Sequence, residues 1–147
     1  MMMEGIVREI DEGVSAANQG NTLVALVHLE KAAREGRSPR ITSYLGYCLA
    51  RERKQVAQGL ALCRQAIQKE PASTEHYLNL GRVYLIAGQK GQAIKAMRRG
   101  LKNGRNSHLI KELQRLGRRR PPLFQGLTRN HPANKYAGLL LHRLGWR

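Results

Sequence analysis

The sequence contains little of what sheet, secreted or membrane proteins usually need. Aromatic residues make up 5% of its 147 residues, and there are two cysteines. Runs of Val, Ile and Thr that alternate with polar residues, as in half-buried strands, do not occur. No stretch approaches the 18 or so apolar residues that would indicate a membrane span. These absences favour an all-α chain that lies in a reducing compartment.

Patterns that carry chemistry are also missing. Cys48 and Cys63 form no CxxC motif and have no histidine at metal-ligand spacing, so we expect two small buried residues. The five histidines are scattered, with no HExxH motif. Neither a P-loop nor a GxGxxG motif is present, and the N-terminus lacks the pattern of a secretory signal. The sequence therefore predicts no catalytic residue, no metal, no cofactor and a cytoplasmic protein.

Acidic residues are scarce, and their distribution is uneven. The chain has 26 basic and ten acidic residues, for a net charge of +16. Residues 98–147 contain 13 of the basic residues but only one acidic residue, Glu112. Such an asymmetry suggests an anionic partner, which would be an acidic protein, a nucleic acid or an anionic membrane surface.

What the chain does have is an internal repeat of small residues. Ala25, Gly59 and Ala93 are 34 residues apart, and the same spacing separates Ala32, Ala66 and Gly100. Another glycine series, Gly13, Gly46 and Gly81, has spacings of 33 and 35, which places one extra residue in the second repeat, near residues 51–58. The periodicity predicts helices over 4–18, 22–35, 39–53, 56–69, 74–87, 90–103 and 107–116.

These positions resemble the tetratricopeptide repeat (TPR) family over residues 5–107. The third repeat matches best, with Tyr77, Leu80, Gly81, Tyr84, Gly88 and Ala93 at the family's positions. The resemblance implies a right-handed α-solenoid of three helix hairpins, with residues 107–116 as a capping helix. It also implies that Gly46, Gly81, Tyr84 and Ala93 have structural roles, and that Gly81 and Ala93 face each other where two helices cross. Gly100 would make a second close contact with the next helix.

The resemblance further implies a concave groove lined by the first helix of each hairpin. Mapped from the repeat register, the groove residues are Asp11, Asn18, Arg40, Tyr44, Tyr47, Arg51, Asn79 and Arg82. Tyrosines and arginines in such a groove suit a peptide, because they provide stiff contact area and carboxylate pairing. Asp11, Tyr44 and Glu75 do not fit the pattern of a chaperone-type carboxylate clamp, so the expectation is a groove for an acidic or carboxylate-bearing segment.

The last 30 residues depart from the repeat pattern. We expect a solenoid with its capping helix over 5–117 and a basic extension over 118–147 that contains Arg118, Arg119, Arg120 and a short amphipathic helix at 133–144. Three interpretations of the extension stay open. It folds back on the solenoid, docks on another protein or a second copy of the chain, or lies on an anionic membrane surface.

Together these features predict a non-catalytic adaptor that binds a protein or peptide, in particular an acidic one, in the groove. The alternative is a tether to anionic membrane or nucleic acid through the basic extension. Self-association into a homo-oligomer through an end face or the C-terminal helix is a further expectation, because three repeats leave apolar end faces.

Overall fold

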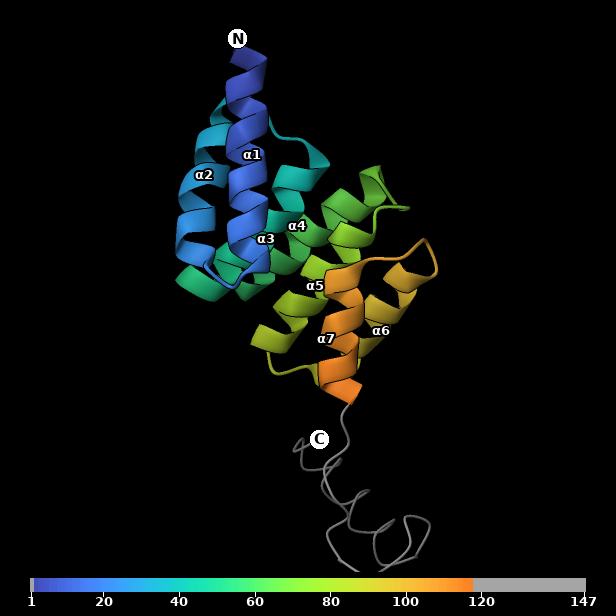
Figure 1. The fold of residues 1–147 in the computed structure, drawn as a ribbon. Helices are drawn as coiled ribbons and strands as arrows, with labels where there is room; N and C mark the ends of the chain where they lie inside the picture. Colours follow the sequence, from blue (N-terminus) through green and yellow to red (C-terminus); the bar gives the residue numbers. More distant parts are fainter. Residues whose placement is uncertain (1, 118–147) are drawn as a thin grey trace, which may run out of the picture. The chain divides into compact units, whose positions relative to one another are not determined.

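The computed structural model describes residues 2–117 (Figure 1). The predicted extension over 118–147, with Arg118, Arg119, Arg120 and the expected helix at 133–144, lies outside the described residues. Seven helices and no strand make up the described part. They are α1 (Met2–Asn18), α2 (Thr22–Glu35), α3 (Pro39–Arg53), α4 (Val56–Lys69), α5 (Thr74–Ile86), α6 (Lys90–Leu101) and α7 (Ser107–Gly117).

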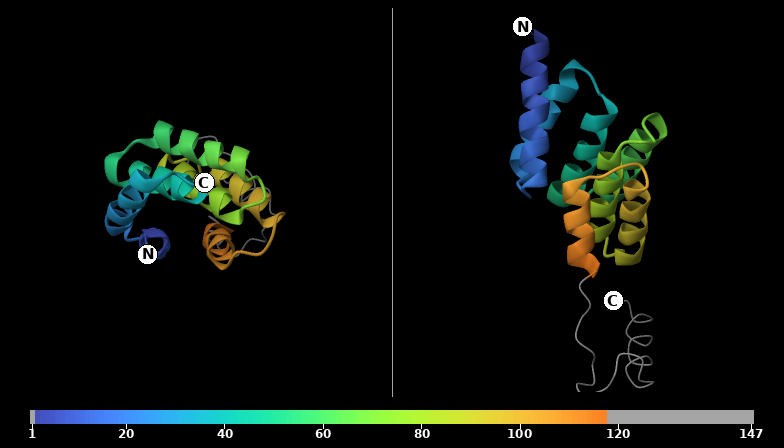
Figure 2. Two further views of the ribbon diagram at one scale, coloured as in Figure 1. Left: turned by 90° about the horizontal axis from the view of Figure 1, so that it is seen from above. Right: turned by 45° about the vertical axis from the view of Figure 1, so that its right-hand side comes forward.

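The first six helices form three hairpins, which stack on one another. α1 packs with α2, α3 with α4, and α5 with α6. The second helix of each hairpin also packs on the first helix of the next, so that α2 contacts α3 and α4 contacts α5. Seen from above, α2, α4 and α6 form the outer side of a curved array (Figure 2). The all-α solenoid predicted from the repeat is confirmed.

Local signals explain where these helices begin and end. Ser38 caps α3, since its hydroxyl oxygen accepts a hydrogen bond from the Ile41 amide, and Pro39 occupies the first helical position. Gly20 and Gly88 have φ values of +84° and +76° in the turns inside the first and third hairpins. Glycine suits these turns because it reaches the left-handed region without steric cost.

Small residues allow the two helices of each hairpin to approach closely. A Cβ added at Gly81 would lie 2.6 Å from Met97 Cγ and 3.3 Å from the carbonyl oxygen of Ala93. At Gly100 it would lie 2.7 Å from Tyr77 Cβ and 2.9 Å from Leu109 Cδ1 of α7. Both predicted close contacts are therefore confirmed, and the loss of helix propensity at these glycines is offset by tight packing.

The second hairpin holds the extra residue that the uneven spacing predicts. α3 continues to Arg53, and Lys54 and Gln55 alone connect it to α4. Lys54 adopts a left-handed conformation with φ +58°, and its amide donates to the Leu49 carbonyl oxygen. A lysine thus stands in a conformation that glycine adopts in the other two hairpins.

None of the helices in residues 2–117 combines the length and the apolar character that a membrane span requires.

Candidate functional site

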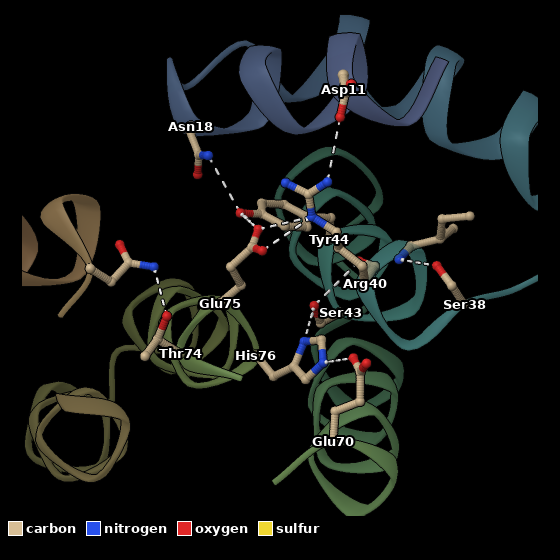
Figure 3. A network of polar contacts seen from close by, with 12 residues as sticks. Asp11, Asn18, Ser38, Arg40, Ser43, Tyr44, Glu70, Thr74, Glu75 and His76 are labelled. Atoms are coloured by element: carbon tan, nitrogen blue, oxygen red, sulfur yellow. Dashed lines mark hydrogen bonds and ion pairs between the residues drawn. The ribbon is translucent and has the colours of Figure 1, made fainter. Parts of the chain in front are cut away.

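Polar side chains from α1, α3 and α5 form one continuous network between these helices. Figure 3 shows the part of it around Arg40, Tyr44 and His76. Hydrogen bonds bring together six of the eight predicted groove residues: Asp11, Asn18, Arg40, Tyr44, Asn79 and Arg82. Tyr47 joins them through a cation–π contact with Arg82, and Arg51 bonds to Tyr47. The network has an acidic end, a buried middle and a cationic end.

The acidic end contains a neutralised arginine. Arg40 Nε donates to both carboxylate oxygens of Glu75 at 3.1 and 3.3 Å, and Arg40 also pairs with Asp11 at 3.5 Å. The hydroxyl of Tyr44 donates to Glu75 at 2.6 Å. Burial, together with the charge of the Glu75 carboxylate, raises the pKa of Tyr44, so this phenol stays protonated. The positive charge of Arg40 is thus already matched within the protein.

The buried middle contains a serine, a histidine and a glutamate in line. His76 Nδ1 lies 2.8 Å from Ser43 Oγ, and His76 Nε2 lies 2.8 Å from Glu70 Oε1. Such a chain resembles a nucleophilic triad, but Ser43 and His76 are both fully buried. Asn79 also donates to Ser43 Oγ at 3.2 Å. No substrate can approach this hydroxyl without disrupting the packing around it. The three side chains instead form a structural link between α3, the end of α4 and α5.

The cationic end centres on Arg82, Tyr47 and Arg51, which we call the arginine–tyrosine cluster. One terminal nitrogen of Arg82 donates to the side-chain oxygens of Asn18 at 2.9 Å and Asn79 at 3.2 Å. The Arg82 guanidinium lies 5.0 Å from the centre of the Tyr47 ring, within the range of a cation–π interaction. The hydroxyl of Tyr47 accepts a bond from Arg51 at 3.0 Å.

Arg82 is unusual because it is nearly buried without a carboxylate partner. It is 7% exposed, and none of its hydrogen bonds or ion pairs within residues 2–117 involves Asp or Glu. Every buried polar side-chain atom of the described residues has a hydrogen-bond partner, so the nitrogens of Arg82 that make no bond reach the surface. They present N–H donors between α1, α3 and α5.

The structure therefore divides the predicted groove residues by accessibility. Asp11 and Arg51 are exposed, and Arg40 and Asn18 are partly buried. The side chains of four others are buried and already bonded within the protein: Tyr44, Tyr47, Asn79 and Arg82. Sequence reasoning missed the contributions of His76 and Glu70, because a single histidine and a helix-terminal glutamate carry no motif. Their convergence depends on how the hairpins stack.

A cluster of possible metal ligands lies between α1 and α2. Ligand atoms of Glu9, Glu12 and His28 lie within 4.8 Å of one another. Lys31 pairs with Glu9 at 2.7 Å and Arg8 pairs with Glu12 at 2.9 Å, so cationic side chains already occupy these carboxylates. The hydrogen bonds from Lys31 and His28 lower the pKa of Glu9. The cluster is accounted for as an ion-pair network that joins the first two helices.

A cavity of about 600 Å³ lies on the other side of α3, between α2 and α4. Leu45 and Leu49 contribute its apolar lining, and Arg34, Arg37 and Arg53 contribute charge. In the next hairpin the repeat position of Leu49 holds Tyr84, whose hydroxyl accepts a bond from Arg64 at 2.7 Å. The cavity does not include the arginine–tyrosine cluster.

Stacked antiparallel helix hairpins with small residues at their crossings define the class of helical-repeat proteins. Residues 50–116 match the family model described as tetratricopeptide repeat. Residues 50–116 therefore contain tetratricopeptide repeats, as the sequence predicted, and the helices of residues 2–117 form an all-α solenoid. No curated protein sequence is similar enough to count as a relative.

Solved structures with the same fold include three chains that are each 18% identical to this one. The O-GlcNAc transferase of Thermobaculum terrenum matches 78% of this chain with a TM-score of 0.61, but the match spans only 22% of that enzyme. The first TPR domain of human RPAP3 matches 76% of this chain and 88% of its own, with a TM-score of 0.56. The first TPR of Spaghetti (RPAP3), solved with an HSP90 peptide, matches 77% and 90%, with a TM-score of 0.55. At this identity the likeness establishes the fold alone.

Proposed function

We propose that this protein is a non-catalytic adaptor that binds an acidic peptide or protein segment on the inner face formed by α1, α3 and α5. The arginine–tyrosine cluster receives a carboxylate of the partner. The observation that carries this proposal is Arg82, a guanidinium at 7% exposure whose hydrogen bonds go to neutral amide oxygens.

A carboxylate fits this position for electrostatic reasons. Removing a charge from water is unfavourable unless an opposite charge compensates it. Amide oxygens and an aromatic ring compensate Arg82 only in part, whereas a carboxylate would supply the opposite charge in a site of reduced solvent screening. The planar guanidinium also matches a carboxylate with two parallel hydrogen bonds.

Tyr47 holds the two arginines of the cluster at one place. Its ring lies beneath Arg82, and its hydroxyl accepts the bond from Arg51. Because Tyr47 is itself 7% exposed, its position is set by packing within α3 and its neighbours. Two cations are thereby ordered before a partner arrives, which lowers the entropic cost of binding.

The acidic end of the network determines how an acidic partner is oriented on this surface. Arg40 is already paired with Glu75 and Asp11, so two carboxylates accompany one cation there. A segment with acidic residues is repelled by this end and attracted by Arg51 and Arg82. The acidic part of the partner therefore lies at the arginine–tyrosine cluster.

The comparison with solved structures supports the proposal at the level of fold. The HSP90 peptide in the Spaghetti structure has the sequence SRMEEVD, which contains three acidic residues. A TPR array of similar topology thus accommodates an acidic segment in that protein. The carboxylate-binding residues proposed here, Arg51 and Arg82, are assigned from the geometry of this chain alone.

A peptide-binding experiment with the full chain tests the proposal. Peptides with clustered Glu and Asp would be selected from a library by the wild-type protein, and affinities then measured for Arg51→Gln. We expect at least about tenfold weaker binding, because a hydrogen bond to a charged group contributes roughly 1.5–3 kcal/mol. Replacing the peptide's acidic residues with Gln or Asn should have a similar effect.

Arg53→Gln is the matched control. Arg53 lies in the same helix, but it pairs with Glu30 at 2.9 Å and lines the cavity beside α2. It should therefore leave peptide affinity unchanged. Equal losses for both variants, or undiminished binding of the uncharged peptide, would overturn the assignment of the site.

A further inference from the structure

The outer surface of α6 carries a row of cations that no part of the adaptor function uses. Lys95, Arg98 and Arg99 of α6 and its C-cap residue Lys102 are all exposed, and we call them the α6 basic stripe. Their spacing of three, four and seven residues from Lys95 places them along one side of a helix. The opposite side of α6 is occupied by the buried packing residues Ala93, Ala96, Met97 and Gly100.

The charges of the stripe are not neutralised within the described residues. No ion pair of residues 2–117 includes Lys95, Arg98, Arg99 or Lys102. The one acidic residue among residues 90–117 is Glu112, and it pairs with Arg115 at 2.8 Å. Arg99 is held over the Tyr77 ring at 5.5 Å. This side of the solenoid therefore has a concentrated positive potential.

The repeat architecture does not require these cations. The equivalent positions of α2 are Val27, Glu30, Lys31 and Arg34, and α4 keeps a single charge there, Arg64. Cations in the last turn of a helix do stabilise its dipole, which accounts for Arg98 and Arg99 in part. Lys95 lies in the middle of α6, where that effect has faded.

We propose that the α6 basic stripe binds the sugar–phosphate backbone of a nucleic-acid duplex without reading its sequence. Phosphate contacts from Lys and Arg supply most of sequence-independent affinity for nucleic acid, and they need an array of unpaired, accessible cations. The stripe is such an array.

Other anionic partners fit the stripe less well. The core of a protein interface is enriched in aromatic residues and depleted in Lys, but the residues of the stripe and its exposed neighbours Gly91 and Gln92 are polar or small. A membrane-surface helix inserts an apolar face, and the apolar face of α6 is buried in the solenoid. Single strands are held by stacking on exposed aromatic rings, and Tyr77 beneath Arg99 is only 2% exposed.

This surface is independent of the proposed peptide site. α6 lies on the outer side of the array, whereas Arg51 and Arg82 belong to the inner helices α3 and α5 (Figure 2). Failure of duplex binding would leave the peptide experiment unaffected, and the reverse also holds.

Salt-dependent binding of the full chain to a random-sequence duplex tests the inference, with DNA and RNA duplexes as separate arms. Each phosphate contact contributes about 0.9 to the slope of log affinity against log salt for duplex DNA. The triple variant Lys95→Gln/Arg98→Gln/Lys102→Gln should therefore bind more weakly at low salt. Its slope should be smaller by about 2–3 between about 50 mM and about 200 mM salt.

The control removes the same charge elsewhere. Arg37→Gln/Lys54→Gln/Lys69→Gln neutralises three exposed cations outside α6, and it should keep the wild-type slope. Helical circular dichroism and thermal midpoints confirm that both variants fold. The inference would be overturned if the intact chain did not bind duplexes at low salt, or if both variants lost the same slope. Tighter binding to anionic vesicles or to single strands than to duplexes would also overturn it.

Discussion

Gly46 and Gly59 face each other across the second hairpin, each against the other's backbone. A Cβ on Gly46 would lie 2.8 Å from the carbonyl oxygen of Gly59, and a Cβ on Gly59 would lie 2.6 Å from that of Gly46. Neither side has room for a methyl group. In the third hairpin the corresponding pair is Gly81 and Ala93, where the nearest atoms to an added Cβ belong to the side chain of Met97.

The loss of stability caused by a methyl group at these helix crossings should depend on which atoms the new Cβ contacts. We expect Gly59→Ala to destabilise the protein by about 1–3 kcal/mol, because the backbone of α3 must move. Gly81→Ala should cost less, since the two nearest atoms to the new Cβ belong to the side chain of Met97 and not to the backbone. Thermal or urea unfolding measures both. Gly91→Ala, with no atom within 4 Å of the added Cβ, is the control and should not destabilise. Equal losses at all three positions would contradict the packing argument.

The left-handed residue between α3 and α4 predicts a stabilising substitution. Lys54 has φ +58°, a conformation that costs a residue with a Cβ about 1 kcal/mol or more. Lys54→Gly should raise the free energy of unfolding by about 0.5–1 kcal/mol after the greater entropy of unfolded glycine is counted. The reciprocal change Gly88→Ala, at φ +76°, should lower it. A lower thermal midpoint for Lys54→Gly would show that the lysine side chain makes a compensating contact.

Tyr44→Phe tests the acidic end of the inner network. The substitution removes the donor to Glu75 from a residue that is 1% exposed, and it should cost about 1–3 kcal/mol of stability. Tyr84→Phe is the comparison, because the hydroxyl of that partly buried residue bonds to exposed Arg64. Tyr84→Phe should lower the free energy of unfolding by less than about 1 kcal/mol. The two free energies come from urea unfolding, and a larger loss at Tyr84 would contradict the network.

The two cysteines should be unreactive until the protein unfolds. Burial raises the pKa of Cys48 to about 12 from an ordinary value of 9.0, and it also raises the pKa of Cys63. Above pH 9.0 the thiols ionise in the unfolded protein but stay protonated in the folded one. Their contribution to the free energy of unfolding is therefore fully present below pH 9.0 and is lost as the pH rises through the folded-state pKa. Maleimide labelling near neutral pH should modify both thiols in denaturant and neither in buffer. Rapid labelling of the native protein would refute their burial.

Much of the fold was predictable because the repeat imposes local steric rules. A crossing between two helices of one hairpin needs small residues at a set spacing, and Ala25, Gly59 and Ala93 display it in the sequence. Even the uneven spacing of Gly13, Gly46 and Gly81 indicated the extra residue of the second hairpin, between Gly46 and α4. These features involve residues that are close along the chain.

The state of the groove residues was less predictable, because it depends on contacts between hairpins. Asp11, Tyr44 and Asn79 share one repeat position, yet Asp11 is exposed while the other two are 1% and 0% exposed. In α3 and α5 this position contacts the preceding hairpin, through Tyr44 with Asn18 and Asn79 with Ser43. Within the described residues no hairpin precedes α1, and Asp11 has only its ion pair with Arg40. The same stacking brings Arg82 beside Asn18, 64 residues earlier, a contact that no local pattern reveals.

Nuclear magnetic resonance on the full chain tests the central claim most directly. An acidic peptide would be titrated into labelled protein while the Nε–H signals of Arg51 and Arg82 and the side-chain amide of Asn18 are followed. The account predicts saturable shifts of these three signals that disappear when the peptide's acidic residues are replaced by their amides. Saturable shifts confined to α2, α4 or α6, with Arg51 and Arg82 unchanged, would contradict it.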